Sequence, residues 1–493
     1  MNHRTRFAGL QVLVVTLLLF VTFTAGAQDI GSDQDLEMDL DSLFGEELVE
    51  IEAAAPVNSD PVSAALTSES VRIGGSYSGS LASKVDWNNG SEIFDPSAIS
   101  ISPAVKATLY FDGRPKEDFR VFGSVKTGWP FSTRKILVPG TVYLEDNNPF
   151  LDGDQPGNSI FNDSINSPSI SVFELFSDIS LDDKVFIRFG KSTVKWGVGY
   201  FWSPADVINL TGIDVLDTSA QREGPVNIRI HLPIAGTQNN FYLYTVLDEN
   251  NVDFDTTALA GKAEFLIGMY ELGLGAHYRY DTAERGMITL TGPLGDFDVF
   301  GEAIVSRGSS KAFATGIDTT APFIHTRSSD EVRGTFFFSA STGFRYSNSN
   351  SNFSLLGQYY YNGEGYLKTE KDALINQGEL AITTLNSIDT TSAGGLKGRL
   401  AGLIYGSGRH YAAMSLSKSK LFSDDFSTSM TIVANLSDLS GFIQPSFNYA
   451  VHDNLSLNLS SNFVFGASDS EYVYLAQENI VSLSLGATVS GAF

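Results

Sequence analysis

The sequence contains no cysteine, and its 32 Lys and Arg are outnumbered by 57 Asp and Glu, which gives a formal net charge of −25. The absence of cysteine excludes disulfides, thiol catalysis and thiolate metal sites. The acidic balance argues against nucleic acid as a partner. Long apolar runs are also missing after residue 27, since Gly, Ser, Asn or a charge interrupts each one within a few residues. A bundle of transmembrane helices is therefore excluded.

The one long apolar stretch lies at the N-terminus. It runs from Leu10 to about Thr24, follows two arginines, and ends in the small residues Ala25-Gly26-Ala27. This pattern is typical of a secretory signal peptide, here residues 1–27, which is cleaved on export. A retained anchor is the alternative, but polar residues interrupt the run and it falls short of the ~20 apolar residues of a spanning helix.

Residues 28–69 form an acidic leader. Twelve Asp and Glu and no Lys or Arg occur between Gln28 and Val71. We interpret this segment as a periplasmic leader with one short amphipathic helix near Asp39 to Glu50. A plug, or a peptide that engages an energy-coupling partner, is the alternative. Plugged lumens belong to barrels of about 22 strands, which so short a segment cannot fill.

From residue 70 onward the hydrophobic pattern has a period of two. Apolar residues alternate with polar or basic ones in the segment Val226 to Leu232. The same alternation recurs at 119–127, 185–189, 270–280, 332–346, 353–361 and 455–465. Many of these runs approach the roughly 9–11 residues of a tilted transmembrane strand, whereas strands in soluble sandwiches average about 5–6 residues.

Two further features favour a membrane barrel over a soluble sandwich. Tyr and Phe gather at the ends of the expected strands, as in Tyr359-Tyr360-Tyr361, where aromatic girdles meet the membrane interfaces. The connectors also fall into two classes, as expected for short periplasmic turns and long outer loops. Tight ones are expected at 181–183, 347–352 and 406–408, and long ones near 129–169, 192–224, 307–331 and 363–395.

These patterns predict an all-β fold, a transmembrane antiparallel up-and-down β-barrel over residues 70–493. A raw count finds about 19 candidate strands, whereas a single-chain barrel with both ends in the periplasm needs an even number. We therefore expect 16–18 strands. The candidates to be discarded lie at Met287 to Thr291 or within 373–400.

The last segment, Val481 to Phe493, alternates throughout and ends in an aromatic residue. A final strand with a terminal Phe resembles the recognition segment that outer-membrane barrels present to their assembly machinery. The resemblance implies a location in the outer membrane, with its lipid and the barrel assembly machinery as partners, and Phe493 as the assembly signal. An ordinary edge strand that happens to end in Phe is the alternative.

A second resemblance lies between Phe189 and Pro225. This stretch contains Lys191, Lys195-Trp196-Gly197 and Ser203-Pro204-Ala205-Asp206, and it resembles a segment of porin-like outer-membrane proteins. Its glycines permit sharp turns, so the loop could bend inward and narrow a pore, or it could pack on the outer rim. The candidate constriction residues are Trp196, Trp202, Asp206, Asp214, Arg222 and Glu223.

If the apolar phase of each strand faces lipid, the opposite phase faces the lumen. That phase includes acids such as Asp298 and Glu302, but basic residues predominate. Rings of basic residues favour anionic solutes; alternatively, they pair with acids and stiffen the wall. The candidate pore-lining residues are Arg120, Lys126, Arg188, Arg229, Lys262, Arg279, Arg333, Arg345 and Arg399.

Catalysis finds little support, because none of the six His lies with a Ser and an acid in a recognisable arrangement. Acids at 145–154 do not follow the EF-hand spacing, so we expect no metal, cofactor or enzyme activity. We expect a passive channel for small hydrophilic solutes, with anions favoured, and leave a homo-oligomer open. The alternatives are uptake of hydrophobic molecules, with the leader as a hatch, and an adhesin or structural barrel that acts through its outer loops.

Overall fold

The computed structural model describes residues 67–68, 71–87, 99–130, 143–144 and 169–493, with gaps at 219, 249–252, 281, 312, 319–322, 328, 388–389 and 477–479. The predicted signal peptide lies outside the described residues, as do the acidic loop 145–154 and all of the leader except residues 67–68. Their assignments stay predictions.

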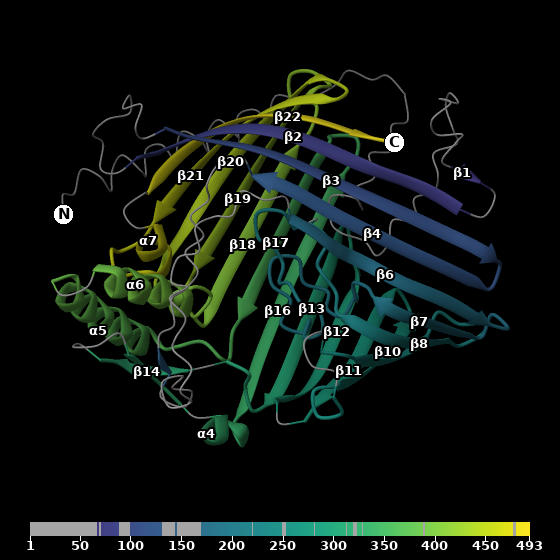
Figure 1. Cartoon of the computed structure of the whole chain (residues 1–493), viewed down its shortest axis with the longest axis horizontal. Helices are drawn as coiled ribbons and strands as arrows, with labels where there is room; N and C mark the ends of the chain where they lie inside the picture. Colours follow the sequence, from purple (N-terminus) through teal and green to yellow (C-terminus); the bar gives the residue numbers. More distant parts are fainter. Residues whose placement is uncertain are drawn as a thin grey trace.

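Eighteen antiparallel strands form one closed barrel (Figure 1). The strands are β2 (Val71–Trp87), β3 (Ile99–Lys116), β4 (Phe119–Pro130), β6 (Ser169–Leu181), β7 (Val185–Lys191), β8 (Val226–Pro233), β9 (Asn240–Val246), β10 (Ala258–Ile267), β11 (Tyr270–Arg279), β12 (Glu284–Leu294), β13 (Phe297–Arg307), β16 (Phe336–Asn348), β17 (Phe353–Tyr361), β18 (His410–Lys418), β19 (Phe426–Asn435), β20 (Ser440–His452), β21 (Leu455–Phe465) and β22 (Val481–Ala492). Each pairs with the next, and β22 pairs back onto β2. A closed barrel leaves no free sheet edge. The two-residue β1 (Thr67–Ser68) adds to the start of β2.

The connectors alternate between the two ends of the barrel. One end carries only short turns, such as 182–184 and 295–296, whereas the other carries the long connectors 192–225, 308–335 and 362–409. Because the number of strands is even, β2 begins and β22 ends at the short-turn end. The tight connectors predicted at 181–183 and 347–352 and the long ones predicted near 192–224, 307–331 and 363–395 are confirmed, whereas most of 129–169 lies outside the described residues. The prediction at 406–408 is wrong, because these residues belong to the long connector before β18.

Exposure alternates along the strands in the way a lipid-facing barrel requires. On β13, Phe300, Glu302 and Ile304 are buried, whereas Val305 is 46% exposed. On β8, Leu232 is 43% exposed while Asn227 is fully buried. A soluble protein rarely exposes an apolar band of this kind, whereas a bilayer favours it.

Two predicted strand regions are corrected. The segment 332–346 is not one strand, because Ser329–Arg333 form the short helix α4 and β16 begins only at Phe336. Gly334 follows the helix, the position where glycine commonly ends one. Arg333 therefore lies on an exposed helix end and not on the barrel wall.

The region 373–400 is helical, and the discarded strand candidates lie there. It contains α5 (Lys368–Asn386) and α6 (Thr390–Ile404), so Arg399 lies on a helix and not on a strand. Buried residues of α5 follow helical spacing, as in Leu374, Ile375, Gly378 and Ile382. Residues 287–291, by contrast, lie within β12. Among the described residues, no helix has the length and apolar character needed to cross a membrane.

The connectors 308–335 and 362–409 together build a small unit, which we call the rim domain. It contains α4, α5, α6, β14 (Ala314–Ile317) and β15 (Phe323–Thr326), and β15 also pairs with β5 (Tyr143–Leu144). Figure 1 shows α5 and α6 beside one end of the long strands, near α7 (Glu471–Ala476), and α4 close to the start of β16. The rim domain has its own apolar core, in which Ile324, Leu396 and Leu400 are almost completely buried.

Candidate functional site

The connector between β7 and β8, residues 192–225, folds into the barrel, and we call it the inner loop. It hydrogen-bonds to side chains on β13 and β17, strands that lie on a distant part of the wall. Its residues Trp196, Phe201 and Ala205 are at most 2% exposed. The inner loop therefore occupies part of the lumen.

Glu302 on β13 holds the first half of the inner loop. Its Oε2 accepts hydrogen bonds from the backbone N–H of Val198 at 2.6 Å and of Gly199 at 3.3 Å, and from the Ser203 hydroxyl at 3.2 Å. Its Oε1 accepts the N–H of Ala205 at 3.3 Å. Four donors thus satisfy a carboxylate that is only 4% exposed, as a buried charge requires.

Gln358 on β17 holds the tip of the inner loop. Its Oε1 accepts the N–H groups of Tyr200 at 3.1 Å and Phe201 at 2.7 Å, and its Nε2 donates to the Trp202 carbonyl at 2.6 Å. Gln358 is a functional residue that the sequence pattern did not reveal. The signal available in the sequence was a polar amide on the lumen-facing side of the strand, between Leu356 and Tyr360.

Apolar packing supports the same loop. Trp196 meets Tyr244 edge to face, with ring centroids 5.4 Å apart, and Trp202 stacks on Tyr360 at 5.8 Å. Phe201 belongs to a cluster with Phe300 and other wall residues. The two predicted tryptophans thus contact inward-facing aromatic residues of the wall.

Close approach explains two glycines of the loop. A Cβ on Gly197 would overlap the Ser203 hydroxyl and lie 2.7 Å from Oε2 of Glu302, and one on Gly199 would overlap the Trp202 carbonyl. Any larger residue would displace the backbone from its hydrogen bonds to the wall.

Polar contacts also close the base of the loop. Arg222 pairs with Asp206, which accepts a bond from Asn209 at 2.9 Å. Glu223 pairs with Lys191 at 2.7 Å. Asp214 is exposed, and its carboxylate accepts the N–H of Leu216 at 2.9 Å.

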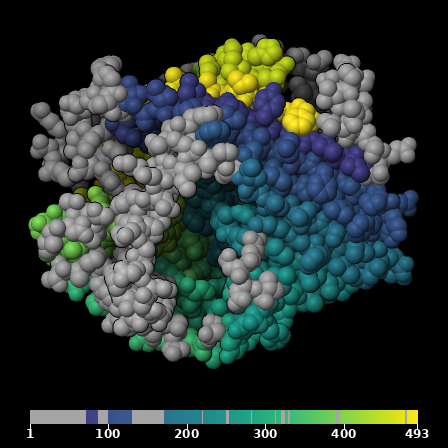
Figure 2. Space-filling model, viewed as in Figure 1, coloured from purple at the N-terminus to yellow at the C-terminus, as the bar shows by residue number. Residues whose placement is uncertain are grey.

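A cavity of about 440 Å³ lies against the inner loop. Four arginines line it, whereas the carboxylates in its lining are Glu174 and Asp298. The arginines are Arg188, Arg222, Arg229 and Arg345. Figure 2 shows the molecule hollowed at its centre, between walls drawn in teal and green. The cavity lining is therefore predominantly basic.

Arg188 and Arg229 lie directly opposite each other on β7 and β8. Arg188 pairs with Asp178 through two bonds of 2.7 and 2.9 Å. No ion pair joins Arg229 to a carboxylate in the part of the chain that the structure describes, and its Nε is buried without a hydrogen-bond partner. Like charges in directly opposed positions destabilise a sheet, so this arrangement calls for a reason other than stability.

A β-bulge in β6 brings a further charge into the cavity. The register with β4 shifts at Ser124/Val125, and both Phe173 and Glu174 are buried, at 8% and 7% exposure. Glu174 accepts the N–H of Thr193 at 3.4 Å, and the Lys126 ammonium lies 3.2 Å from the Phe173 ring centroid. Strict alternation places two consecutive residues on opposite faces, so the sequence pattern did not reveal Glu174.

The remaining predicted pore-lining residues on strands are mostly paired with acids. Arg120 contacts Asp112 at 2.8 Å, Lys262 contacts Glu264 at 2.7 Å, Arg279 contacts Asp248 at 3.1 Å and Arg345 contacts Asp298 at 3.3 Å. Lys126 instead approaches Gln221 of the inner loop at 3.5 Å. The inner wall is therefore rich in basic residues, and ion pairs hold many of them in place.

No protein-family model matches this sequence, and no curated protein matches it. Similar solved structures include OccAB1 of Acinetobacter baumannii, with 12% identity, a TM-score of 0.47, and coverage of 86% of this chain and 97% of that one. A BenF-like porin from Pseudomonas fluorescens Pf-5 has 8% identity, a TM-score of 0.45 and coverage of 86% and 99%. Salmonella typhi OmpF in complex with daunomycin has 10% identity, a TM-score of 0.38 and coverage of 85% and 97%.

Proposed function

We propose that the protein is a porin-like channel of the outer membrane, through which small hydrophilic solutes diffuse passively and anions pass more readily than cations. The observation that carries this proposal is the inner loop. It is held to distant strands by Glu302 and Gln358, and it lies against a cavity that four arginines line.

The size of the barrel supports a water-filled path. Side chains can fill a barrel of about eight strands, whereas barrels of about 16–18 strands leave an aqueous channel. Here an 18-stranded wall encloses a loop that narrows the lumen, with polar and charged side chains in the remaining space. A loop fixed so firmly sets a constant cross-section and thereby the size of solute that passes.

The charges nearest the path support a preference for anions. The chain as a whole is acidic, at −25, but twelve of its acids belong to the leader. Water and salt screen exposed charges within roughly 8–10 Å. Arg229 has no carboxylate partner among the described residues, so its positive charge is available to a passing anion.

Location and partners follow from the outer face and the two barrel ends. The exposed apolar band fits lipid, and the short-turn end, where β2 begins and β22 ends, would face the periplasm. In this proposal the barrel assembly machinery recognises Phe493. The candidate constriction residues are Trp196, Trp202, Asp206, Arg222 and Glu223, with Asp214 at the exposed part of the loop.

Conductance of the purified protein in planar lipid bilayers tests the proposal. We expect stepwise insertion of channels and, across a potassium chloride gradient, a reversal potential that indicates mild anion preference. A cation-selective channel would contradict the part played by the arginines. Absence of any conductance would contradict the channel and favour uptake of hydrophobic molecules or an adhesin.

A further inference from the structure

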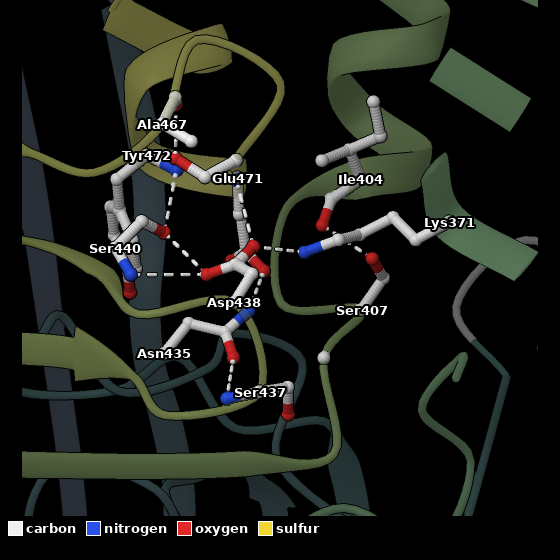
Figure 3. Close-up of polar contacts among 12 residues, drawn as sticks. Lys371, Ile404, Ser407, Asn435, Ser437, Asp438, Ser440, Ala467, Glu471 and Tyr472 are labelled. Atoms are coloured by element: carbon white, nitrogen blue, oxygen red, sulfur yellow. Dashed lines mark hydrogen bonds and ion pairs between the residues drawn. The ribbon is translucent and has the colours of Figure 1, made fainter. Parts of the chain in front are cut away.

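Three charged side chains from three separate connectors meet in a buried cluster at the long-connector end of the barrel (Figure 3). Lys371 lies on α5, Asp438 in the turn between β19 and β20, and Glu471 at the start of α7. They are 2%, 7% and 0% exposed. The Lys371 ammonium pairs with Oδ2 of Asp438, which also accepts the Glu471 N–H at 2.9 Å.

Glu471 extends the cluster to the base of the rim domain. Its Oε1 accepts the N–H of Gly406, just after α6, at 2.9 Å. Its Oε2 accepts the Tyr411 hydroxyl at 2.8 Å and the Asn435 amide at 2.7 Å. One side chain of α7 therefore holds the end of the rim domain and two residues of the barrel wall together.

Within the rim domain, the connector 362–409 is joined to the barrel by a narrow neck, which we define as residues 362–367 and 406–409. The two neck segments hydrogen-bond to each other, from the Asn362 N–H to the Arg409 carbonyl at 2.8 Å and from the Tyr366 N–H to the Ser407 carbonyl at 2.7 Å. Gly406 adopts a φ of 65°. Much of the apolar core lies within the rim domain itself, and the buried cluster adds a polar attachment between α5, the end of α6 and the barrel.

The cluster also borders the lumen. Tyr472, next to Glu471, packs edge to face on Phe442 with ring centroids 5.6 Å apart. Phe442 belongs to the same apolar cluster as Phe201 of the inner loop. Contacts thus run from the rim domain through α7 to the proposed constriction.

We propose that Lys371, Asp438 and Glu471 form a latch that holds the rim domain at the outer mouth of the barrel, and that release of this latch widens the mouth. The proposal rests on the proposed channel function. Loss of one partner from a buried ion pair leaves an uncompensated charge and is strongly destabilising. Release therefore has to bring these buried groups into contact with water or with new partners.

Cysteine labelling measures release independently of conduction. The natural chain has no cysteine, so Ser407→Cys supplies a single thiol at a neck position that is 1% exposed. Lys371→Met and Asp438→Asn are then added separately. Lys420→Met is the matched control, because Lys420 pairs only loosely with Asp424, at 3.9 Å, on an exposed turn at the other end of the barrel.

We expect both latch variants to accelerate maleimide labelling of Cys at position 407 by about tenfold or more, since local opening exposes the thiol. The control should label at the original rate, and all variants should keep a heat-modifiable barrel. In planar bilayers, the latch variants without the added cysteine should show a larger conductance than the natural protein.

The outcomes separate the latch from the channel. Unchanged labelling in folded Lys371→Met and Asp438→Asn overturns the latch. Faster labelling with unchanged conductance contradicts the proposal that the rim domain sets the width of the mouth. Faster labelling in a protein that never conducts supports the latch and contradicts the proposed channel. If Lys371→Met fails to assemble, Asp438→Asn, which keeps the side-chain shape, decides.

Discussion

Gly75 and Phe493 exchange two backbone hydrogen bonds, each 3.0 Å long, one in each direction. They join the last residue of the chain to the first strand of the barrel. The Phe493 ring also lies over Gly75, where a Cβ would come within 2.9 Å of it. The C-terminal residue thus takes part in closing the barrel.

This closure sharpens the prediction for the assembly signal. Phe493→Ser keeps the backbone bonds but removes the ring, whereas deletion of Phe493 removes both. We expect both variants to reduce assembled, heat-modifiable protein in the outer membrane sharply, and Ser490→Ala in the same strand to have little effect. Loss confined to the deletion would instead indicate that Phe493 acts through closure alone.

The facing of β8 predicts opposite results for two neighbouring residues. Ile228 lies on the outward phase, so Ile228→Arg should cost about 2–4 kcal/mol if it lies near the bilayer midplane. Arg229→Ala should leave the free energy of unfolding nearly unchanged, because it removes one of two opposed positive charges. Denaturant unfolding in lipid vesicles measures both. A larger loss of unfolding free energy in Arg229→Ala than in Ile228→Arg would show that the two residues face the opposite sides of the wall.

Selectivity should follow the arginines of the cavity. Replacing Arg188 and Arg229 together by Ala should move the reversal potential toward cation preference, most visibly at low ionic strength, where screening is weaker. Arg307→Ala is the control, since Arg307 is 54% exposed and pairs with Glu284 on the outer side of the barrel. An equal shift in the control would assign selectivity to surface charge.

The fixed inner loop predicts a change in channel noise. Glu302→Ala removes four hydrogen bonds to the loop, and bonds to a charged group contribute about 1.5–3 kcal/mol each. Single-channel recordings should show larger and more variable conductance. Glu264→Ala, which affects a lumen acid paired with Lys262, should not have this effect. If the conductance of Glu302→Ala is as small and as steady as that of the natural protein, apolar packing alone is sufficient to hold the loop.

The latch should tighten under mild acid. Its two carboxylates outnumber its one ammonium, and burial raises the pKa of Glu471. The latched state therefore binds a proton more tightly than the released state, and this contribution is lost as the pH rises through the raised pKa. Asp438 acts in the opposite direction only in stronger acid, because its hydrogen bond from Lys371 lowers its pKa although burial opposes this.

We therefore expect conductance to fall as the pH is lowered from neutrality toward 4.5, the ordinary pKa of a glutamate. Glu471→Gln should remove most of this dependence, and a variant that keeps it in full would contradict the assignment to Glu471. Several titratable groups besides Glu471 face this cluster from the elements packed against it. They are Lys371, Asp438, Tyr405, Tyr411, Tyr472 and Lys311.

The barrel itself followed from local patterns in the sequence. A period of two predicted β17 and β21 residue for residue, because a lipid-facing strand must alternate whatever surrounds it. The even strand number required a candidate to be discarded but left two suspect regions, of which 373–400 forms α5 and α6 and 287–291 lies within β12. The assignments of Arg333 and Arg399 to the wall were wrong, because alternation over a few residues also occurs by chance in a short helix or a connector.

The inner loop and its charges depended on tertiary structure. Whether residues 192–225 bend inward is decided by Glu302 and Gln358, which lie 104 residues from Val198 and 157 residues from Phe201. Likewise, only the strand register shows that Asp178 pairs with Arg188 and leaves Arg229 without an acid among the described residues. Sequence periodicity reports the face on which a side chain lies, but its partner across the lumen is set by how the whole barrel closes.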